Sequence, residues 1–191
     1  MKNIVIFISG RGSNMEAILN NIESGVLKGV CNVLCVVSNR ADAAGLDTAR
    51  SYGVKTAVVI SRGISPEKYN NNLSELIDEY NPDYIVLAGY MKILDPDFVK
   101  RYPKRIINIH PADTSAHQGL HAYEWAFENR LKESFITVHY VDEGVDTGEV
   151  IGKASVDMGG ADSLEEYEKR GLAVEHSFYS EMLKKVFTGI I

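Results

Sequence analysis

The stretch NIVIFISGRGSNMEAILNNIESG, residues 3–25, decides the fold of this chain. Its beginning, NIVIFIS (3–9), is apolar almost throughout and predicts a strand that is buried on both faces. Its end, SNMEAILNNIESG (13–25), has helical spacing, and Ser13 and Glu16 stand at the interval of a capping box. A buried strand that turns tightly into a helix indicates the α/β class.

The same alternation of strand and helix continues along the rest of the chain. Further strands are expected at 31–38, 55–60, 83–89, 105–110, 134–141 and 149–156, and helices at 42–52, 66–80 and from 164 to near the C-terminus. Ser65 with Pro66 opens the third helix, and Ser163 with Glu166 repeats the capping box. No helix separates the last two strands. The predicted fold class is therefore α/β, an open, mostly parallel, Rossmann-like sheet with helices on both faces and an antiparallel C-terminal strand pair.

Composition narrows the class of function. The chain has 191 residues, 45% apolar and 24% charged, which is ordinary for a globular protein, and we expect a single domain over 1–191. A net charge of −6 supplies no basic surface for nucleic-acid phosphates, so a nucleic-acid partner is disfavoured. No apolar stretch approaches the roughly 18 residues of a membrane span, and the N-terminal residues lack a secretory cleavage signal. We therefore expect a cytoplasmic protein without a membrane partner.

The two cysteines, Cys31 and Cys35, lie four positions apart in the segment CNVLCVV. In a regular strand this interval places both side chains on one face. A disulfide or a metal site would need further ligands or a secreted context, so we expect two buried thiols and no bound metal.

The loop SGRGSN (9–14) joins the first strand to the first helix. Its glycines allow backbone N–H groups to turn toward one point, and the helix N-terminus adds partial positive charge, so the loop can hold a phosphate. Arg11 can reinforce such a site. The loop is neither a full dinucleotide fingerprint nor a P-loop, and a tight turn that needs Gly10 and Gly12 for purely structural reasons is the alternative.

A second candidate site lies at the end of the strand RIINIH (105–110), before Pro111. Asn108 and His110 are two positions apart, so they share one strand face and can aim at the same point beyond the sheet. An amide donor beside an imidazolium suits an oxygen that gains negative charge. The alternative is a structural histidine that is hydrogen-bonded to the backbone.

The segment VHYVDEGVDTGEVI (138–151) supplies acidic residues between glycines. If this loop folds over His110, one carboxylate would raise the histidine pKa and keep the ring protonated at neutral pH. A solvated acidic hairpin is the alternative, and sequence spacing does not decide between the two.

Together these segments resemble the phosphoribosylglycinamide formyltransferases of purine synthesis, within the wider family that uses 10-formyltetrahydrofolate. The resemblance covers nearly the whole chain in order. It is carried by IVIFISGRGSN, VVSNRADAAGLDTA, PDYIVLAGYMKIL, INIHP, GLHAYEWAFEN, VHYVDEGVDTGEVI and VEH (174–176).

The resemblance implies three groups of site residues. The catalytic residues would be Asn108, His110 and Asp146. The amine substrate would bind through a phosphate loop and through a carboxylate that meets its glycinamide end, at Gly12, Ser13, Asn14 and Glu175. The folate would lie against Asn108 and two further segments, Met91, Lys92, Ile93 and Leu94, and Asp142, Glu143, Gly144 and Val145.

The implied reaction is attack of the amine on the formyl carbon of 10-formyltetrahydrofolate. Asn108 and protonated His110 would hold the tetrahedral oxyanion, and Asp146 would keep His110 charged and assist proton movement. The implied partners are a phosphorylated small-molecule amine and the folate, with no metal, no nucleic acid and no membrane. A monomer or a homodimer is expected.

The chain departs from the family pattern at binding positions. After NIHP the family usually continues with Ser-Leu-Leu-Pro and a Pro-Gly pair, whereas this chain reads ADTSAHQG (112–119), which adds His117. Pro66 stands where an arginine often helps to bind the folate, although Arg62 is close in sequence, and Leu172 replaces a frequent glutamine. Formyl transfer is therefore better supported than the identity of the acceptor amine.

Other functions stay open at this point. An amino-sugar nucleotide formyltransferase would share the catalytic residues, and formyltetrahydrofolate hydrolase would use water in place of the amine. A tRNA-directed formyltransferase is disfavoured by the lack of a basic surface. A folate- or phosphate-binding protein without turnover would have little use for Asn108, His110 and Asp146 together.

Overall fold

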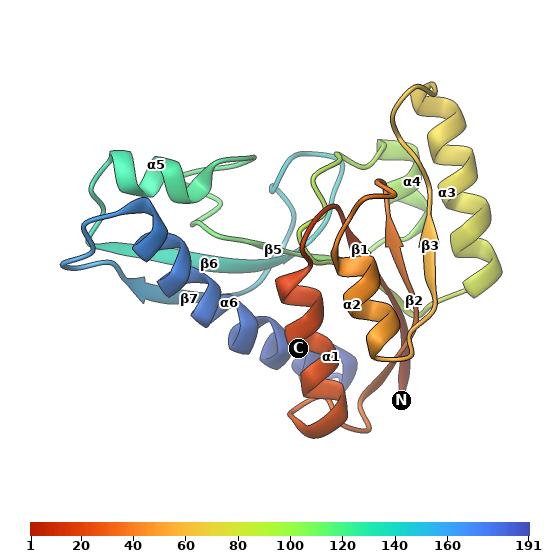
Figure 1. Cartoon of the computed structure of the whole chain (residues 1–191), viewed down its shortest axis with the longest axis horizontal. Coiled ribbons are helices and arrows are strands. Elements are labelled where there is room, and N and C mark those ends of the chain that lie inside the picture. Colours follow the sequence, from red (N-terminus) through yellow and green to blue (C-terminus); the bar gives the residue numbers. More distant parts are fainter.

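The computed structural model describes all 191 residues, and its centre is a seven-stranded sheet (Figure 1). The strands are β1 (Lys2–Ile8), β2 (Cys31–Ser38), β3 (Thr56–Val58), β4 (Tyr84–Leu87), β5 (Ile106–His110), β6 (Glu133–Tyr140) and β7 (Val150–Asp157), and their spatial order is β3-β2-β1-β4-β5-β6-β7. β3, β2, β1, β4 and β5 pair in parallel, whereas β6 pairs antiparallel with both β5 and β7. The predicted sheet, with its antiparallel C-terminal pair, is confirmed.

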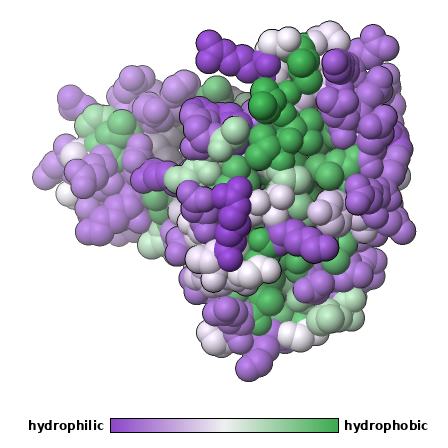
Figure 2. Space-filling model, turned by 45° about the vertical axis from the view of Figure 1, so that its right-hand side comes forward, coloured by the Kyte–Doolittle hydropathy of each residue, from purple (hydrophilic) through white to green (hydrophobic).

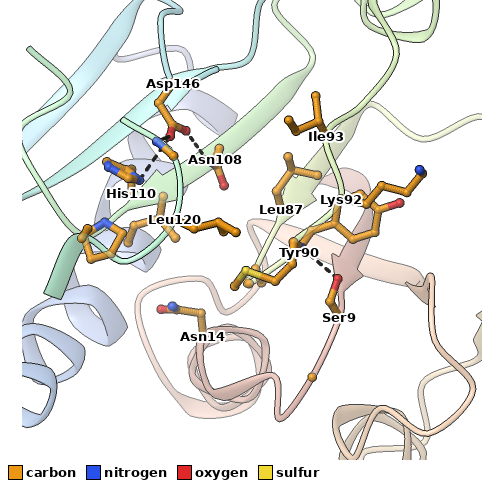
Figure 3. Close-up of a pocket in the computed structure, with 18 of the residues that line it drawn as sticks. Ser9, Asn14, Leu87, Tyr90, Lys92, Ile93, Asn108, His110, Leu120 and Asp146 are labelled. Carbon is orange, nitrogen blue, oxygen red and sulfur yellow. Dashed lines mark hydrogen bonds and ion pairs between the residues drawn. The ribbon is translucent and has the colours of Figure 1, made fainter. Parts of the chain in front are cut away.

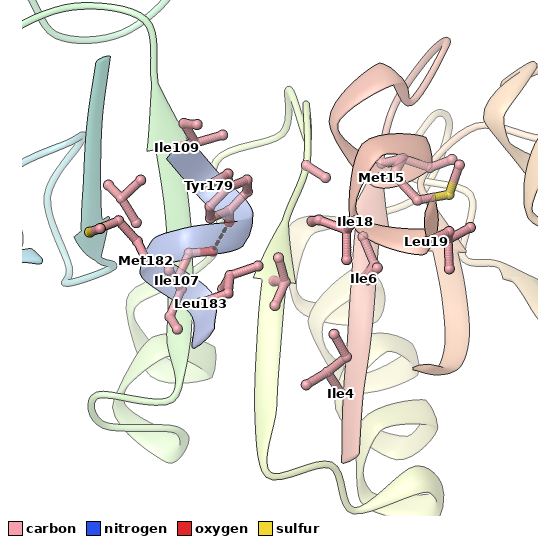
Figure 4. Packing of buried hydrophobic residues seen from close by; sticks show 14 of the residues in the cluster. Ile4, Ile6, Met15, Ile18, Leu19, Ile107, Ile109, Tyr179, Met182 and Leu183 are labelled. Carbon is pink, nitrogen blue, oxygen red and sulfur yellow. Dashed lines mark hydrogen bonds between the residues drawn. The ribbon is translucent and has the colours of Figure 1, made fainter. Parts of the chain in front are cut away.

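Helices cover both faces of the sheet, as predicted (Figure 1). They are α1 (Ser13–Ser24), α2 (Gly45–Ser51), α3 (Pro66–Tyr80), α4 (Pro96–Arg101), α5 (Ala122–Glu128) and α6 (Leu164–Phe187). Alternate residues of β1 enter two separate cores. Ile4 and Ile6 belong to the core that also holds side chains of α1, α2, α5 and α6 (Figure 4). Val5 and Phe7 belong to the core that holds side chains of α3 and α4. Because β1 is buried on both faces, it reads as a continuous apolar run.

Two short helices, α4 and α5, were not expected from the sequence. A signal for α4 was present, because Asp95 caps the helix through its side chain and Pro96 occupies the first turn. Helix α5 begins after His121, which has a φ of 66° and makes no side-chain cap. A start of that kind has no marker in the sequence.

The predicted caps of the helices have different outcomes. Ser65 and Ser163 each accept a hydrogen bond from a backbone N–H in the first turn, but the Glu166 carboxylate pairs with Arg170 and does not complete the expected capping box. The capping box of Ser13 and Glu16 is wrong. Gly12 is the capping residue, with a φ of 74° that favours glycine, and no side chain closes this end of α1. Its first N–H groups therefore stay open to a ligand.

The expectation that Cys31 and Cys35 share one face of β2 is also wrong. The pairing with β1 shifts register between Ile4 and Val5, so that Leu34 is an extra residue in β2. Such a bulge reverses the alternation of side chains beyond it. Cys31 consequently packs in the core on the α1 side and Cys35 in the core on the α3 side. Both are buried free thiols, as predicted.

Helix α6 is anchored to the sheet by Tyr179, whose side chain is 1% exposed. Its hydroxyl lies within hydrogen-bonding distance of the backbone carbonyls of Leu87, at 2.9 Å, and Ile107, at 3.0 Å (Figure 4). These carbonyls belong to the adjacent strands β4 and β5. The hydroxyl therefore ties α6 to both strands next to the position of Asn108.

We expect Tyr179→Phe to lower the free energy of unfolding by about 1–3 kcal/mol, because the phenyl ring keeps the packing but leaves buried carbonyls without this donor. Chemical denaturation followed by circular dichroism measures the change. Tyr84→Phe is the matched control, since the hydroxyl of Tyr84 makes no hydrogen bond within the chain and the ring packs on Phe187. Equal stability of the Tyr179 variant and the parent would contradict the anchoring role.

Candidate active site

A cavity of about 730 Å³ opens at the carboxyl ends of the parallel strands (Figure 3). The segments after β1, β4, β5 and β6 line it, together with α6, and these are the loops expected to carry function. The sheet order places the cavity where β1 and β4 lie side by side although they are distant in the sequence. Its size lies within the range of small-molecule sites.

Asp146 joins the two polar residues at the end of β5. Its Oδ1 accepts a hydrogen bond from Asn108 Nδ2 at 3.2 Å, and its Oδ2 lies 3.4 Å from His110 Nδ1 (Figure 3). The backbone N–H of Gly119 donates to Oδ2 at 2.8 Å. Asp146 has a φ of 52°, an uncommon backbone conformation for a residue other than glycine, so the loop turns sharply at the carboxylate.

His139 is a further member of this cluster that sequence reasoning missed. It lies opposite Asn108 in the pairing of β5 with β6, and its side chain is buried. His139 Nδ1 is 2.9 Å from the carbonyl oxygen of Tyr140, and because a carbonyl only accepts, Nδ1 carries the proton. The other ring nitrogen, Nε2, lies 3.3 Å from Asn108 Nδ2 and 3.4 Å from Asp146 Oδ1.

The amide of Asn108 has a defined orientation in this cluster. Its Nδ2 group faces Asp146 and His139, and Figure 3 shows its oxygen on the side away from Asp146. Both bonds of Nδ2 are longer than the usual 2.9–3.0 Å and are therefore weak. A stronger acceptor in the cavity, such as an oxyanion, can draw one of these N–H groups toward itself.

His110 is held by the segment 111–119, where the chain departs from the family pattern. Its Nε2 is 3.0 Å from the carbonyl oxygen of His117, to which it donates. The rings of the two histidines are nearly parallel, with centroids 6.0 Å apart, and the His117 ring also packs on Trp125. Asp113 anchors the segment to β7 through Lys153. The residues that depart from the family pattern therefore hold the His110 ring in a fixed position.

The expected rise in the pKa of His110 is not found. Burial lowers this pKa below its usual value and outweighs the attraction of the Asp146 charge, which raises it. Burial raises the pKa of the Asp146 carboxyl, but the contacts of this carboxyl with His139 and Gly119 and its position beside His110 outweigh burial and leave the pKa below the usual value. Asp146 is therefore ionised, and the free site disfavours a charged His110.

The first loop forms the opposite side of the cavity from Asp146. Gly12, Ser13 and Asn14 line it, and the backbone N–H groups of Ser13 and Asn14 lie in the first turn of α1, where helical partners are missing. Gly12 has the conformation that requires glycine, whereas Gly10 does not and has open space around it. Arg11 also lines the cavity. Open N–H groups at a helix N-terminus are of the kind that can bind an anion.

Glu175 reaches the cavity from α6, although only 5% of it is exposed. Its carboxylate accepts hydrogen bonds from Asn14 Nδ2 at 2.5 Å and from the hydroxyl of Tyr123. Tyr123 was not singled out from the sequence, because its position in the unexpected helix α5 gave no indication of this contact. No cation pairs with Glu175.

The predicted folate segments also line the cavity, with one exception. The residues concerned are Met91, Lys92, Ile93, Leu94, Asp142, Gly144 and Val145. Glu143 does not line it, and its carboxylate lies 3.5 Å from Lys100 Nζ. Leu172 lines the cavity, whereas neither Arg62 nor Pro66 does.

Exposed hydrophobic side chains are concentrated at this cavity. Met91, Ile93, Leu120 and Val145 are all exposed and all line it. Figure 2 shows hydrophobic side chains gathered in the middle of one face, surrounded by hydrophilic ones. A cavity with an apolar wall and polar groups at its ends suits a ligand that has both an aromatic ring and charged groups.

No group of three or more His, Cys, Asp and Glu side chains has an arrangement that could hold a metal ion. None of the helices is both long enough and apolar enough to cross a lipid bilayer.

Comparisons with known proteins identify the family of this chain. Residues 2–183 match the family described as formyl transferase. A phosphoribosylglycinamide formyltransferase of Escherichia coli (strain K12) is 42% identical over 178 residues, which are 93% of this chain and 83% of the relative.

Solved structures of similar proteins have the same fold. The crystal structure of glycinamide ribonucleotide transformylase 1 from Symbiobacterium toebii has a TM-score of 0.93 and 36% identity, with 99% of this chain and 89% of that chain covered. Phosphoribosylglycinamide formyltransferase from Bacillus halodurans also has a TM-score of 0.93, at 34% identity, with 100% and 97% covered. This chain belongs to the formyl transferase family.

Proposed function

We propose that this chain transfers the formyl group of 10-formyltetrahydrofolate to the amine of 5'-phosphoribosylglycinamide, a step of purine synthesis. Formyl transfer from this folate is the general reaction of the family, and the relatives described above carry the name of this activity. The observation that carries the proposal is the contact of one carboxylate, Asp146, with both Asn108 and His110 beside an anion site.

The substrates are assigned to the cavity by their chemistry. The phosphate would bind to the N–H groups of Ser13 and Asn14, and the carboxylate of Glu175 would accept hydrogen bonds from the same substrate. The pterin ring of the folate would lie against the apolar wall, near Met91 and Ile93. The formyl carbon would then stand next to Asn108 and His110, between the two substrates.

The proposed chemistry begins when the amine attacks the formyl carbon and the carbonyl oxygen becomes negative. One N–H of Asn108 turns from Asp146 or His139 toward this oxyanion. His110, which is uncharged in the free site, becomes a stronger base as negative charge develops beside it. It takes the proton that the attacking nitrogen releases and then gives it to the leaving nitrogen of the folate. Asp146 orients the ring and stabilises its charged form.

The setting proposed for this reaction is the cytoplasm. Cys31 and Cys35 are buried free thiols, as is usual in a reducing compartment. Both substrates are small molecules.

An assay of folate release tests the proposed function. The protein is mixed with 10-formyltetrahydrofolate and either phosphoribosylglycinamide, an amino-sugar nucleotide or no amine, and tetrahydrofolate is measured. We expect release with phosphoribosylglycinamide only. Release without an amine would indicate a hydrolase, release with the sugar nucleotide alone would indicate a different acceptor, and tight folate binding without any release would indicate a binding protein.

Replacing the oxyanion donor or the proton carrier should remove most of the turnover. We expect Asn108→Ala to lower kcat about 100- to 1000-fold, because the loss of one oxyanion donor costs roughly 2.7–4 kcal/mol of transition-state stabilisation. His110→Ala should lower kcat by about 100- to 10,000-fold, which is the usual contribution of a general acid–base group. Gln118→Ala, an exposed change in the neighbouring segment, is the control. Steady-state kinetics give the result, and thermal melting checks that the variants fold. Near-normal kcat in both folded alanine variants would rule out the proposed roles.

The charge of Asp146 should set the protonation of His110. In the free protein, NMR titration of the His110 ring should give a pKa below the usual histidine value, because burial dominates. Asp146→Asn should lower this pKa further, since the variant loses the charge that favours imidazolium. Glu143→Gln, in the same loop but outside the cavity, should leave it unchanged. An unshifted or raised pKa in Asp146→Asn would refute the assignment.

A further inference from the structure

Glu175 is an unusual carboxylate because it is buried without a cation. Its two oxygens accept hydrogen bonds from two neutral donors, the amide of Asn14 and the hydroxyl of Tyr123. Burying an ionised carboxylate is costly unless its oxygens are satisfied. The orientation of this carboxylate therefore depends on these two donors, which come from α1 and α5.

Tyr123 reaches Glu175 through a notch in α6. The notch exists because residue 171, one turn before Glu175 on the same helix face, is glycine. A Cβ atom added at Gly171 would lie 2.1 Å from the Tyr123 hydroxyl oxygen and 2.2 Å from its Cε1 atom. Any other residue at 171 would therefore push the tyrosine ring away from α6.

The hydroxyl of Tyr123 stays protonated in this position. Burial raises its pKa far above the usual value, and the negative charge of Glu175 raises it further. The group therefore acts as a permanent hydrogen-bond donor to Glu175 and does not compete as a base.

An unpartnered atom points to the ligand that this arrangement serves. Asn14 uses its Nδ2 group to bind Glu175, and its Oδ1 is buried without any hydrogen-bond partner. A free amide oxygen next to a carboxylate with remaining lone pairs makes a pair of acceptors. Such a pair calls for a ligand that brings N–H or O–H donors, and a buried acceptor left unpaired is costly.

We propose that Tyr123 is a positioning residue for the phosphorylated amine: seated in the notch at Gly171, it fixes the Glu175 carboxylate so that Glu175 and Asn14 together receive the N–H or O–H donors of that substrate. The proposal rests on the proposed function for the identity of the amine. Tyr123 acts through Glu175 and takes no part in proton transfer at the formyl carbon, which occurs at Asn108 and His110. The folate would be unaffected, because its expected segments make no hydrogen bond to Tyr123 or Glu175.

The test is Tyr123→Phe, which removes the hydroxyl and keeps the ring. We expect KM for phosphoribosylglycinamide to rise about tenfold to a hundredfold, the effect of losing one hydrogen bond to a charged group. KM for 10-formyltetrahydrofolate and kcat at saturation should stay within about twofold of the parent. Tyr52→Phe is the matched control, because its hydroxyl also donates a side-chain hydrogen bond, to Asn20, at a site outside the cavity.

Two further variants separate positioning from a merely structural effect. Gly171→Ala should reproduce the rise in KM for the amine, since it displaces Tyr123 without changing it. In a Glu175→Gln background, Tyr123→Phe should change KM for the amine by much less than in the parent, because the two residues act through the same carboxylate. Calorimetric titration with phosphoribosylglycinamide gives the same comparison for binding without turnover.

The possible outcomes are distinct. Unchanged KM for the amine in Tyr123→Phe, an equal rise in KM for both substrates, or fully additive effects with Glu175→Gln would overturn the proposal. If the parent protein neither binds phosphoribosylglycinamide nor turns it over, the proposed function fails instead, and that result is obtained from the parent alone.

Discussion

The contact of Asp146 with Asn108 and His110 is the constraint on which the candidate site depends. An ionised carboxylate, an amide and an imidazole are brought together at the edge of the sheet, where two of them share one face of β5. The third arrives on a loop that turns sharply after the antiparallel strand β6. Because β6 runs antiparallel to β5, the loop after β6 begins beside Ile106, at the start of β5, and folds back toward His110 at its end. The positive φ of Asp146 lies on this returning segment.

Most hydrogen-bonding groups in the cluster of Asn108, His110, His139 and Asp146 already have a partner within the chain. Asp146 accepts from Asn108 and Gly119, while His139 and His110 each use one ring nitrogen on a backbone carbonyl. These backbone contacts fix the direction of both rings. What remains adjustable is the amide of Asn108 and the proton on His110, and these are the two changes that an oxyanion in the cavity would require.

The type of sheet and the position of the cavity were accessible from the sequence because they follow from general rules. Continuous apolar strands such as 3–9 indicate a covered parallel sheet, and parallel sheets place ligands at their carboxyl edge. The site residues could be named beforehand because they fall in short ordered motifs. Asn108 and His110 further share a face through the two-residue period of a strand.

The features that were missed or wrong depend on contacts that no local pattern records. The bulge at Leu34 that separates Cys31 from Cys35 arises in the pairing with β1. The lowered pKa of His110 comes from burial by a segment folded over it, and a nearby carboxylate in the sequence argued for the opposite sign. The capping interval of Ser13 and Glu16 failed because Gly12, in a left-handed conformation, takes the capping position and places Ser13 inside the helix.

Helix α6 has a mechanical consequence for the cavity. The Tyr179 hydroxyl binds α6 to β4 and β5. Tyr179 follows Glu175 by one helical turn, so both side chains lie on the same side of α6. One of these two strands, β5, carries Asn108 and His110. A thermal displacement of α6 would therefore move Glu175 and the end of β5 in the same direction. The distance between Glu175 and the end of β5 is therefore set by the packed helix and sheet and not by the surrounding loops.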